Sequence, residues 1–240
     1  MFKKIHFLPI ALAVVLTLGL AALAVARASA DDERERAMKA GDVLTEVMNI
    51  KESIPSDLMN HAHAVAVIPH MVKGAFIVGG EYGKGLVSER RDDGSWSAPA
   101  YIKIGGGNFG FQIGADATDL VLIFTDKNGF EGLLKGKVKL GADAAVAAGP
   151  VGRNAQVSTD VMLKSPVFAY SRSKGLFAGI ALDGAVVSMD DSANRAAYGK
   201  EVSGHEILMT RDVHKNDVVM PFIKVLEQYA PATAHKRTTD

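Results

Sequence analysis

The sequence predicts a β-rich α+β fold: a single antiparallel sheet, barrel-like or strongly curved, with N- and C-terminal amphipathic helices packed on it. Apolar residues alternate with a period of two in segments such as 101–104, and 119–125 (DLVLIFT) is an aliphatic run typical of a strand buried on both faces. Glycines at 105–107, 110 and 114 lie in or beside these segments, where they permit bulges and bends. We therefore expect roughly eight to eleven short strands.

Composition excludes several classes of protein. The chain has 240 residues, no cysteine, and 27 basic residues against 27 acidic ones. Its length and the lack of a Pro/Ser-rich linker favour one domain, and the lack of cysteine excludes disulfides, thiol chemistry and thiolate metal sites. Residues 1–30 hold three basic residues and no acid, so the remainder has 24 basic and 27 acidic residues, a net charge of about −3. This balance argues against a nucleic-acid-binding protein.

The N-terminus is typical of a bacterial secretory signal. Lys3 and Lys4 precede an apolar run over 7–26, and Ala28-Ser29-Ala30 provides the small residues of a cleavage site. We predict that residues 1–30 are removed after Ala30 and that the protein is periplasmic or secreted. The alternative is an uncleaved segment that anchors the protein in a membrane.

Three regions follow the signal. They are a charged segment over 31–36, the predicted domain over 37–230 and a polar, flexible tail over 231–240. Apolar residues spaced three and four apart between Ala37 and Ile50 predict an amphipathic helix that ends near Pro55. Its polar face is too acidic to adsorb to anionic lipid, so we expect it to cover the sheet. A second amphipathic helix is predicted over 221–229, with Pro221 in its first turn.

Strands and short turns are predicted between these helices. The predicted strands are a segment within 61–70, then 74–82, 84–90, 101–104, 109–113, 119–125, 135–140, 141–148, 167–171, 175–182 and 185–189. Gly83 is predicted to join the second strand to the third. Short helices are predicted over 130–134 and 190–198, the latter capped by Asp190 or Asp191.

Four motifs suggest chemistry but lack the surrounding residues that the chemistry requires. His61 and His63 would share one side of an extended segment, but no third ligand follows at a recognisable spacing, so no metal site is predicted. The glycine run 105–110 precedes strand-like sequence instead of the helix that would receive a pyrophosphate. The S-x-x-K pattern at 171–174 lacks its S-D-N and K-T-G companions, and His205-Glu206 lacks the second histidine of a zinc protease. We predict no catalytic residue and no cofactor, and a hydrolase is the least favoured class.

Several longer segments resemble the SYLF domain family. They are WSAPA, GFQIGADATDLVLIF, GKVKLGADAAVAAGPVGR, YSRSKGLFAGIALDG and ANRAAYG, in order between Met38 and Tyr229. The resemblance implies a lipid-associated domain of the kind found in eukaryotic endocytic proteins and in many exported bacterial proteins, and hence binding instead of catalysis. Relatives are also associated with phosphoinositides and, in fungi, with actin. Many bacterial members carry an acylated cysteine after the signal, which this chain lacks.

Six basic residues are the predicted contacts to lipid headgroups. They are Lys135, Lys137, Lys139, Arg153, Arg172 and Lys174. The three lysines would share one face of an extended segment, and ammonium groups hold phosphate oxygens as point charges. We expect an apolar surface or cavity among the glycine-lined strands beside them.

The predicted function is therefore non-enzymatic binding of an anionic phospholipid or a phosphoinositide-like headgroup. The expected partners are a phospholipid membrane surface and an envelope protein, with peripheral attachment to the membrane. The alternative is a structural or protein-interaction module of the periplasm without a lipid ligand. The small negative charge of the processed chain favours this alternative, because adsorption to anionic lipid gains only about 1 kcal/mol per well-placed cation.

Overall fold

The computed structural model describes residues 8–74, 80–106, 118–152 and 165–232. Its centre is a nine-stranded sheet in the order β5-β9-β3-β2-β1-β4-β7-β6, with β8 paired to β7. The strands are β1 (Ala64–Gly74), β2 (Gly80–Glu89), β3 (Ala100–Gly105), β4 (Thr118–Phe124), β5 (Lys137–Lys139), β6 (Val146–Ala148), β7 (Val167–Ser173), β8 (Leu176–Gly179) and β9 (Val186–Met189). The described helices are α1 (Leu8–Asn49), α2 (Ser56–His61), α3 (Lys127–Leu134), α5 (Asp191–Tyr198), α6 (Gly204–Met209) and α7 (Met220–Tyr229).

The sheet is strongly curved, as the sequence predicts. β5 and β6 stand at opposite ends of the strand order, yet a short turn with a bridge between Leu140 and Ala144 connects them. The sheet therefore curls so that its two edges lie within reach of this turn. Most paired strands are antiparallel, but β6 and β7 are parallel, which corrects the expectation of a purely antiparallel sheet. The reason is that the turn after β5 carries the chain to the far edge of the sheet, where β6 enters alongside β7.

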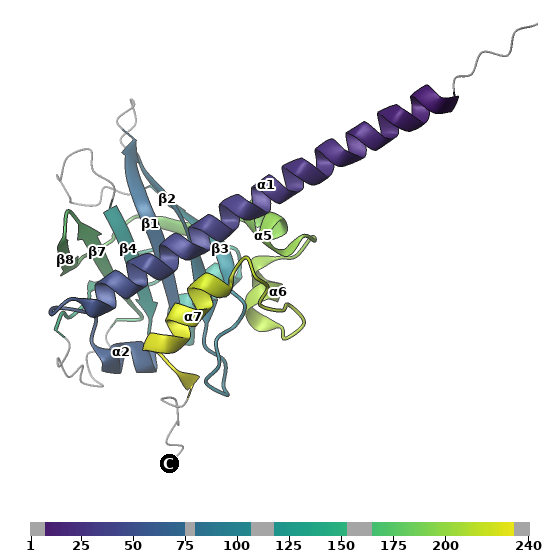
Figure 1. The fold of residues 1–240 in the computed structure, drawn as a ribbon. Helices are drawn as coiled ribbons and strands as arrows, with labels where there is room; N and C mark the ends of the chain where they lie inside the picture. Colours follow the sequence, from purple (N-terminus) through teal and green to yellow (C-terminus); the bar gives the residue numbers. More distant parts are fainter. Residues whose placement is uncertain (1–7, 75–79, 107–117, 153–164, 233–240) are drawn as a thin grey trace, which may run out of the picture.

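Alternating side chains of the strands fill two cores. On β4, Leu122 and Phe124 point to an inner face, where Phe130 of α3 packs against them. Val121 and Ile123 point to an outer face, which α1 and α7 cover (Figure 1). These residues are buried on both sides of the strand, as predicted for 119–125. The inner face of the sheet is thus lined by buried apolar side chains.

α1 packs on the outer face with its C-terminal half only. From residue 27 onward, where the side chains of α1 are described, its buried positions run from Glu33 to Met48 at helical spacing. This confirms the predicted amphipathic helix, although it ends at Asn49 instead of near Pro55. Residues 27, 28, 31 and 32 are exposed, and the preceding turns of the helix project away from the domain (Figure 1). In the described part of the chain, no helix combines the length and the apolar character needed to cross a membrane.

Close packing between β1 and β2 explains why the strand boundary predicted at Gly83 is wrong. β2 runs without interruption through Gly83, so the predicted junction at this residue is wrong. A Cβ atom at Gly83 would lie 2.6 Å from Cγ2 of Ile68, so the glycine lets β2 approach β1 in mid-strand. The ends of the hairpin are instead Gly74 and Gly80, which are paired across the two strands. The predicted strand over 109–113 lies outside the described residues.

The buried Arg90 fixes the C-terminal end of α7. Its guanidinium donates hydrogen bonds to the carbonyl oxygens of Met59, Ala62 and Ala230 at 3.2–3.3 Å and stacks 4.4 Å from the ring centre of Trp96. Burial lowers the pKa of Arg90 to about 10. These contacts join α7 to β2 and so hold α7 beside α1.

Candidate membrane-binding surface

The outer face carries a row of lysines beyond the part that the helices cover. Lys84 on β2 is directly opposite Lys103 on β3, and Lys103 is directly opposite Ser188 on β9. Ser188 is opposite Lys137 on β5. We call Lys84, Lys103, Ser188 and Lys137 the lysine row. Like charges directly opposite each other on neighbouring strands repel, so the row favours the approach of an anion.

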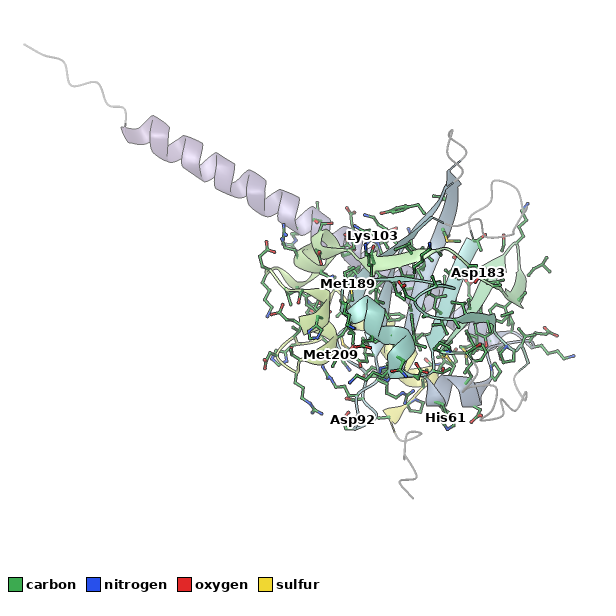
Figure 2. The ribbon with its side chains drawn as sticks, turned by 180° about the vertical axis from the view of Figure 1, so that it is seen from behind. His61, Asp92, Lys103, Asp183, Met189 and Met209 are labelled. Atoms are coloured by element: carbon green, nitrogen blue, oxygen red, sulfur yellow. The ribbon has the colours of Figure 1, made fainter. Side chains whose placement is uncertain are left out.

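The most exposed cations of this surface come from β3 and β5. Lys103, Lys137 and Lys139 are exposed, whereas Ile104 and Val138 between them point into the inner core. Lys139 is two residues from Lys137 and therefore lies on the same face of β5. Among the residues that the structure describes, neither Lys137 nor Lys139 forms an ion pair. Lys103 lies on the side of the domain from which α1 projects (Figure 2).

Asp190 neutralises the β2 end of the lysine row. A carboxylate oxygen of Asp190 lies 3.5 Å from Nζ of Lys84, and its side chain is almost fully buried. Burial on its own raises the pKa of Asp190, but hydrogen bonds from Ser192 and the Ala193 amide, with the charges of Lys84 and Lys103, outweigh burial and hold the pKa below its ordinary value. Asp190 is thus a permanent countercharge for Lys84 at neutral pH.

The structure separates Lys135 from the other two lysines that were predicted to share its face, Lys137 and Lys139. Lys137 and Lys139 share an exposed face of β5, as predicted. Lys135 instead caps the C-terminus of α3, and its ammonium group lies 3.0 Å from the carboxylate of Glu131 one helical turn earlier. Asp126 caps the N-terminus of α3, and the amide of Lys135 still bonds to carbonyl oxygens of the last helical turn, so the extended segment begins after Lys135.

The other predicted cations lie elsewhere. Arg172 is on β7, six places from β5 in the strand order, where it is paired with Asp119 on β4 at 3.2 Å and with Glu46 on α1. Lys174 is at the tip of the β7–β8 hairpin, with a φ angle of 50°. β7 and β8 lie on the opposite side of the ribbon from β3 (Figure 1). Arg153 lies outside the described residues.

Sequence reasoning missed Lys84 and Lys103. The signal for Lys103 was present, because a polar residue between Ile102 and Ile104 must face away from the inner core if the strand alternates. Its position opposite Lys84 depends on the register between β2 and β3, which a single sequence does not reveal.

The histidine pair and the S-x-x-K pattern considered in the sequence do not form sites in the structure. His61 ends α2 and pairs with Asp57, whereas His63 lies 3.2 Å from Glu89, so the two rings do not share one face of an extended segment. Ser171 is buried on β7 within the predicted hairpin, and not at the start of a helix. No group of three histidine or carboxylate side chains suited to a metal ion occurs among residues that the structure describes.

The family model of Ysc84, described as "Las17-binding protein actin regulator", matches residues 105–229, just over half of the chain. The chain belongs to the Ysc84 (SYLF) family. The match covers β5, β7 and β9 and confirms the resemblance that the sequence motifs indicated.

Relatives of this Ysc84-family chain occur in fungi and animals. An SH3 domain-containing protein of Schizosaccharomyces pombe is 36% identical over 179 residues, which are 71% of this chain and 41% of the relative. LAS seventeen-binding protein 3 of Saccharomyces cerevisiae is 34% identical over 188 residues, 77% of this chain and 40% of the relative. The human SH3 domain-containing YSC84-like protein 1 is 35% identical over 181 residues, 73% of this chain and 53% of the relative. The chain thus spans about half the length of these relatives.

Proposed function

We propose that this Ysc84-family protein binds the surface of anionic phospholipid membranes without catalysing a reaction. The observation that carries the proposal is that Lys103, Lys137 and Lys139 project from one face of the sheet and are exposed. A cation near an anionic membrane contributes about 1 kcal/mol, so three contribute about 3 kcal/mol. This free energy supports weak, reversible attachment and is too small for permanent anchoring.

Vesicle sedimentation tests the proposal. Protein purified after expression of the whole 240-residue chain is mixed with vesicles of phosphatidylcholine alone or with phosphatidylglycerol added. We expect binding only to the anionic vesicles, and we expect salt to weaken it because exposed charges are screened. Wild-type protein that stays in the supernatant with both kinds of vesicle would overturn the proposal.

Two triple variants locate the binding surface. Changing Lys103, Lys137 and Lys139 to Glu removes and reverses the proposed contacts, so affinity for anionic vesicles should fall at least about 100-fold. The matched control changes Lys51, Lys127 and Lys224 to Glu, since these lysines are also exposed but lie outside the lysine row. Equal losses in the two variants would indicate an effect of net charge and not a binding surface.

The proposed setting is a bacterial cell envelope, reached by export. The sequence of residues 1–30 supports this, and so does the packing of α1: among its side chains from residue 27 onward, which the structure describes, the first buried one is Glu33, just after the predicted cleavage site at Ala30. Cleavage would leave Asp31, Asp32 and Glu33 in the first turn of α1, where negative charge is favourable for a helix. Mass spectrometry of the protein from periplasmic and cytoplasmic fractions should find Asp31 as the first residue in the periplasm; a full-length chain there would contradict cleavage.

A protein partner is the second candidate, because the family description names binding to the protein Las17 and regulation of actin. Under this alternative, the exposed lysines would contact an acidic protein surface of the envelope. Failure of vesicle binding, together with salt-sensitive capture of one envelope protein that the triple Lys-to-Glu variant loses, would favour it over the lipid.

A further inference from the structure

A cavity of about 340 Å³ lies between α1 and the pair of strands β1 and β2. Its volume is within the range of small-molecule sites. Lys84, the end of the lysine row, lines this cavity, so the cavity adjoins the proposed membrane-binding surface. We call it the α1 pocket.

A bulge in β1 shapes one wall of the α1 pocket. The register of β1 shifts between Val67 and Val72 against β2 and between Ile68 and Met71 against β4. His70 within this bulge has a φ angle of 51°, which is unusual for a residue other than glycine. The amide of His70 donates a 3.0 Å hydrogen bond to Asp119, which fixes the bulge. The imidazole of His70 is 64% exposed and lines the pocket; its Nδ1 atom lies 3.8 Å from the carboxylate of Asp119, so Nε2 is the nitrogen that faces a ligand.

The β1–β2 wall of the pocket carries apolar as well as charged side chains. Val72 and Tyr82 are directly opposite each other on β1 and β2, and they are 53% and 45% exposed. They line the same pocket as Lys84. An apolar pair beside cations matches a ligand that has an apolar part joined to an anionic part.

The charged side chains of the pocket include both signs. Lys39 Nζ is 2.7 Å from Glu35 on the exposed surface of α1, and Arg36 is 2.6 Å from Glu33. Asp32 and Glu35 line the pocket together with Arg36, Lys39 and Lys84. A purely anionic headgroup would therefore meet carboxylates as well as cations, whereas a zwitterionic headgroup finds a partner for each of its charges.

We propose that the α1 pocket binds the headgroup of one zwitterionic phospholipid that carries a primary amine, of the phosphoethanolamine class. The phosphate pairs with Nε2 of His70 and with Lys84, whose side chain stays 41% exposed although Asp190 lies 3.5 Å from its ammonium group. The ammonium group of the lipid donates to Asp32 and Glu35, and the start of the acyl chains lies against Val72 and Tyr82. A quaternary ammonium such as choline is recognised mainly by the faces of Trp, Tyr and Phe rings, and Tyr82 is the one residue of these three types among the described lining residues. This inference rests on the proposed lipid-binding function and adds the lipid class that one pocket selects.

Titration calorimetry with short-chain lipids below their micelle concentration tests the pocket apart from the membrane surface. The probes are dihexanoyl phosphatidylethanolamine, phosphatidylglycerol and phosphatidylcholine, added to the protein purified after expression of the whole chain. We expect the ethanolamine lipid to bind about tenfold more tightly than the other two. Equal affinity for all three lipids, or no binding of the ethanolamine lipid, would overturn the inference.

Variants assign the ammonium site. In the double variant Asp32→Asn with Glu35→Gln, affinity for the ethanolamine lipid should fall about tenfold while affinity for the glycerol lipid stays equal or rises. Asp42→Asn is the matched control, because Asp42 is an exposed acid on the same helix outside the described pocket lining. Retained ethanolamine selectivity in the double variant would contradict the assignment.

The same experiments separate this inference from the proposed function. The triple change of Lys103, Lys137 and Lys139 to Glu should abolish sedimentation with anionic vesicles but leave binding of the short-chain ethanolamine lipid intact. Wild-type protein that binds anionic vesicles and no short-chain lipid would overturn the pocket alone. Wild-type protein that binds the ethanolamine lipid and ignores anionic vesicles would overturn the membrane-surface proposal alone.

Discussion

Arg172 and Lys137 are both cations on the outer face of the same sheet, yet their surroundings differ. Arg172 is held between Glu46 of α1 and Asp119 of β4, and its side chain is 27% exposed. Lys137 stands at the opposite end of the strand order beside Ser188, is exposed, and has no ion pair within the described residues. The first cation therefore joins a helix to the sheet, whereas the second is available to a ligand.

The difference shows that the role of a cation on this sheet depends on whether a carboxylate lies beside it, more than on whether the cation is an arginine or a lysine. Arg172 pairs with carboxylates because α1 passes over β7 and supplies Glu46. At β5, no carboxylate of the described residues forms an ion pair with Lys137. Lys84 is intermediate, since the buried Asp190 neutralises it within the lysine row.

Removing the charge of Arg172 should have the largest effect on stability. Arg172→Gln leaves Glu46 and the partly buried Asp119 without their partner, so the free energy of unfolding should fall by about 1–2 kcal/mol, between the values typical of exposed and buried ion pairs. Lys137→Gln should change it by less than about 0.5 kcal/mol, as is usual for exposed positions. Urea denaturation of both variants measures the difference, and equal values would remove the contrast between the two ends of the sheet.

Local patterns in the sequence predicted most of the strands and little of the site. β3, β4, β7 and β9 follow from alternating or continuous apolar residues, because each pattern is contained within one strand. The lysine row requires β2, β3, β9 and β5 to be neighbours in one register, although Lys84 and Lys137 are far apart in the sequence. No short-range pattern encodes that register, so the predicted cluster joined cations that the fold separates.

Two errors have local causes that the sequence partly contains. Gly83 has the appearance of a turn residue, but its lack of a side chain serves the contact with Ile68. α6 was missed although Ser203 and Glu206 form a capping box at its start, with the Ser203 side chain bonded to the Glu206 amide and the Glu206 carboxylate bonded to the Ser203 amide. The spacing of Ser203 and Glu206 would have indicated this helix.

Arg172→Gln and Lys137→Gln should rank in the opposite order when affinity for membranes is measured in place of stability. Lys137→Gln removes one exposed cation, so affinity for anionic vesicles should fall about fivefold, which corresponds to about 1 kcal/mol. Arg172→Gln should leave the affinity within about twofold, since its charge is already compensated by two carboxylates. Vesicle sedimentation at one fixed salt concentration compares them. A larger loss in Arg172→Gln would place the binding surface at β7 instead of β5.

The pH dependence of stability tests the ion pair between Lys84 and the buried Asp190. The pKa of Asp190 lies below its ordinary value, so its contribution to stability is present above the unfolded-state pKa near 3.8 and is lost as the pH falls through the lower folded-state value. Asp190→Asn keeps an N-cap for α5 but loses the charge, which should cost about 0.5–1 kcal/mol at pH 7. Urea denaturation between pH 2 and 7 should show the difference from wild type shrinking below about pH 4. A difference that stays constant with pH would mean that the Asp190 charge does not stabilise Lys84.

Lys135 should give the smallest effect, and it tests whether one carboxylate is enough to withdraw a cation from the membrane-binding surface. Its partner Glu131 precedes it by four residues on α3, the favourable order for a helical pair, and both side chains are more than half exposed. The pair should stabilise the helix by only about 0.3–0.5 kcal/mol, measured by a double-mutant cycle with Lys135→Gln and Glu131→Gln. Because Lys135 caps α3 and is not part of β5, Lys135→Gln should leave vesicle affinity almost unchanged. If it weakens binding as much as Lys137→Gln does, a weak exposed ion pair does not compensate the cation, and the membrane-binding surface extends from β5 to the end of α3.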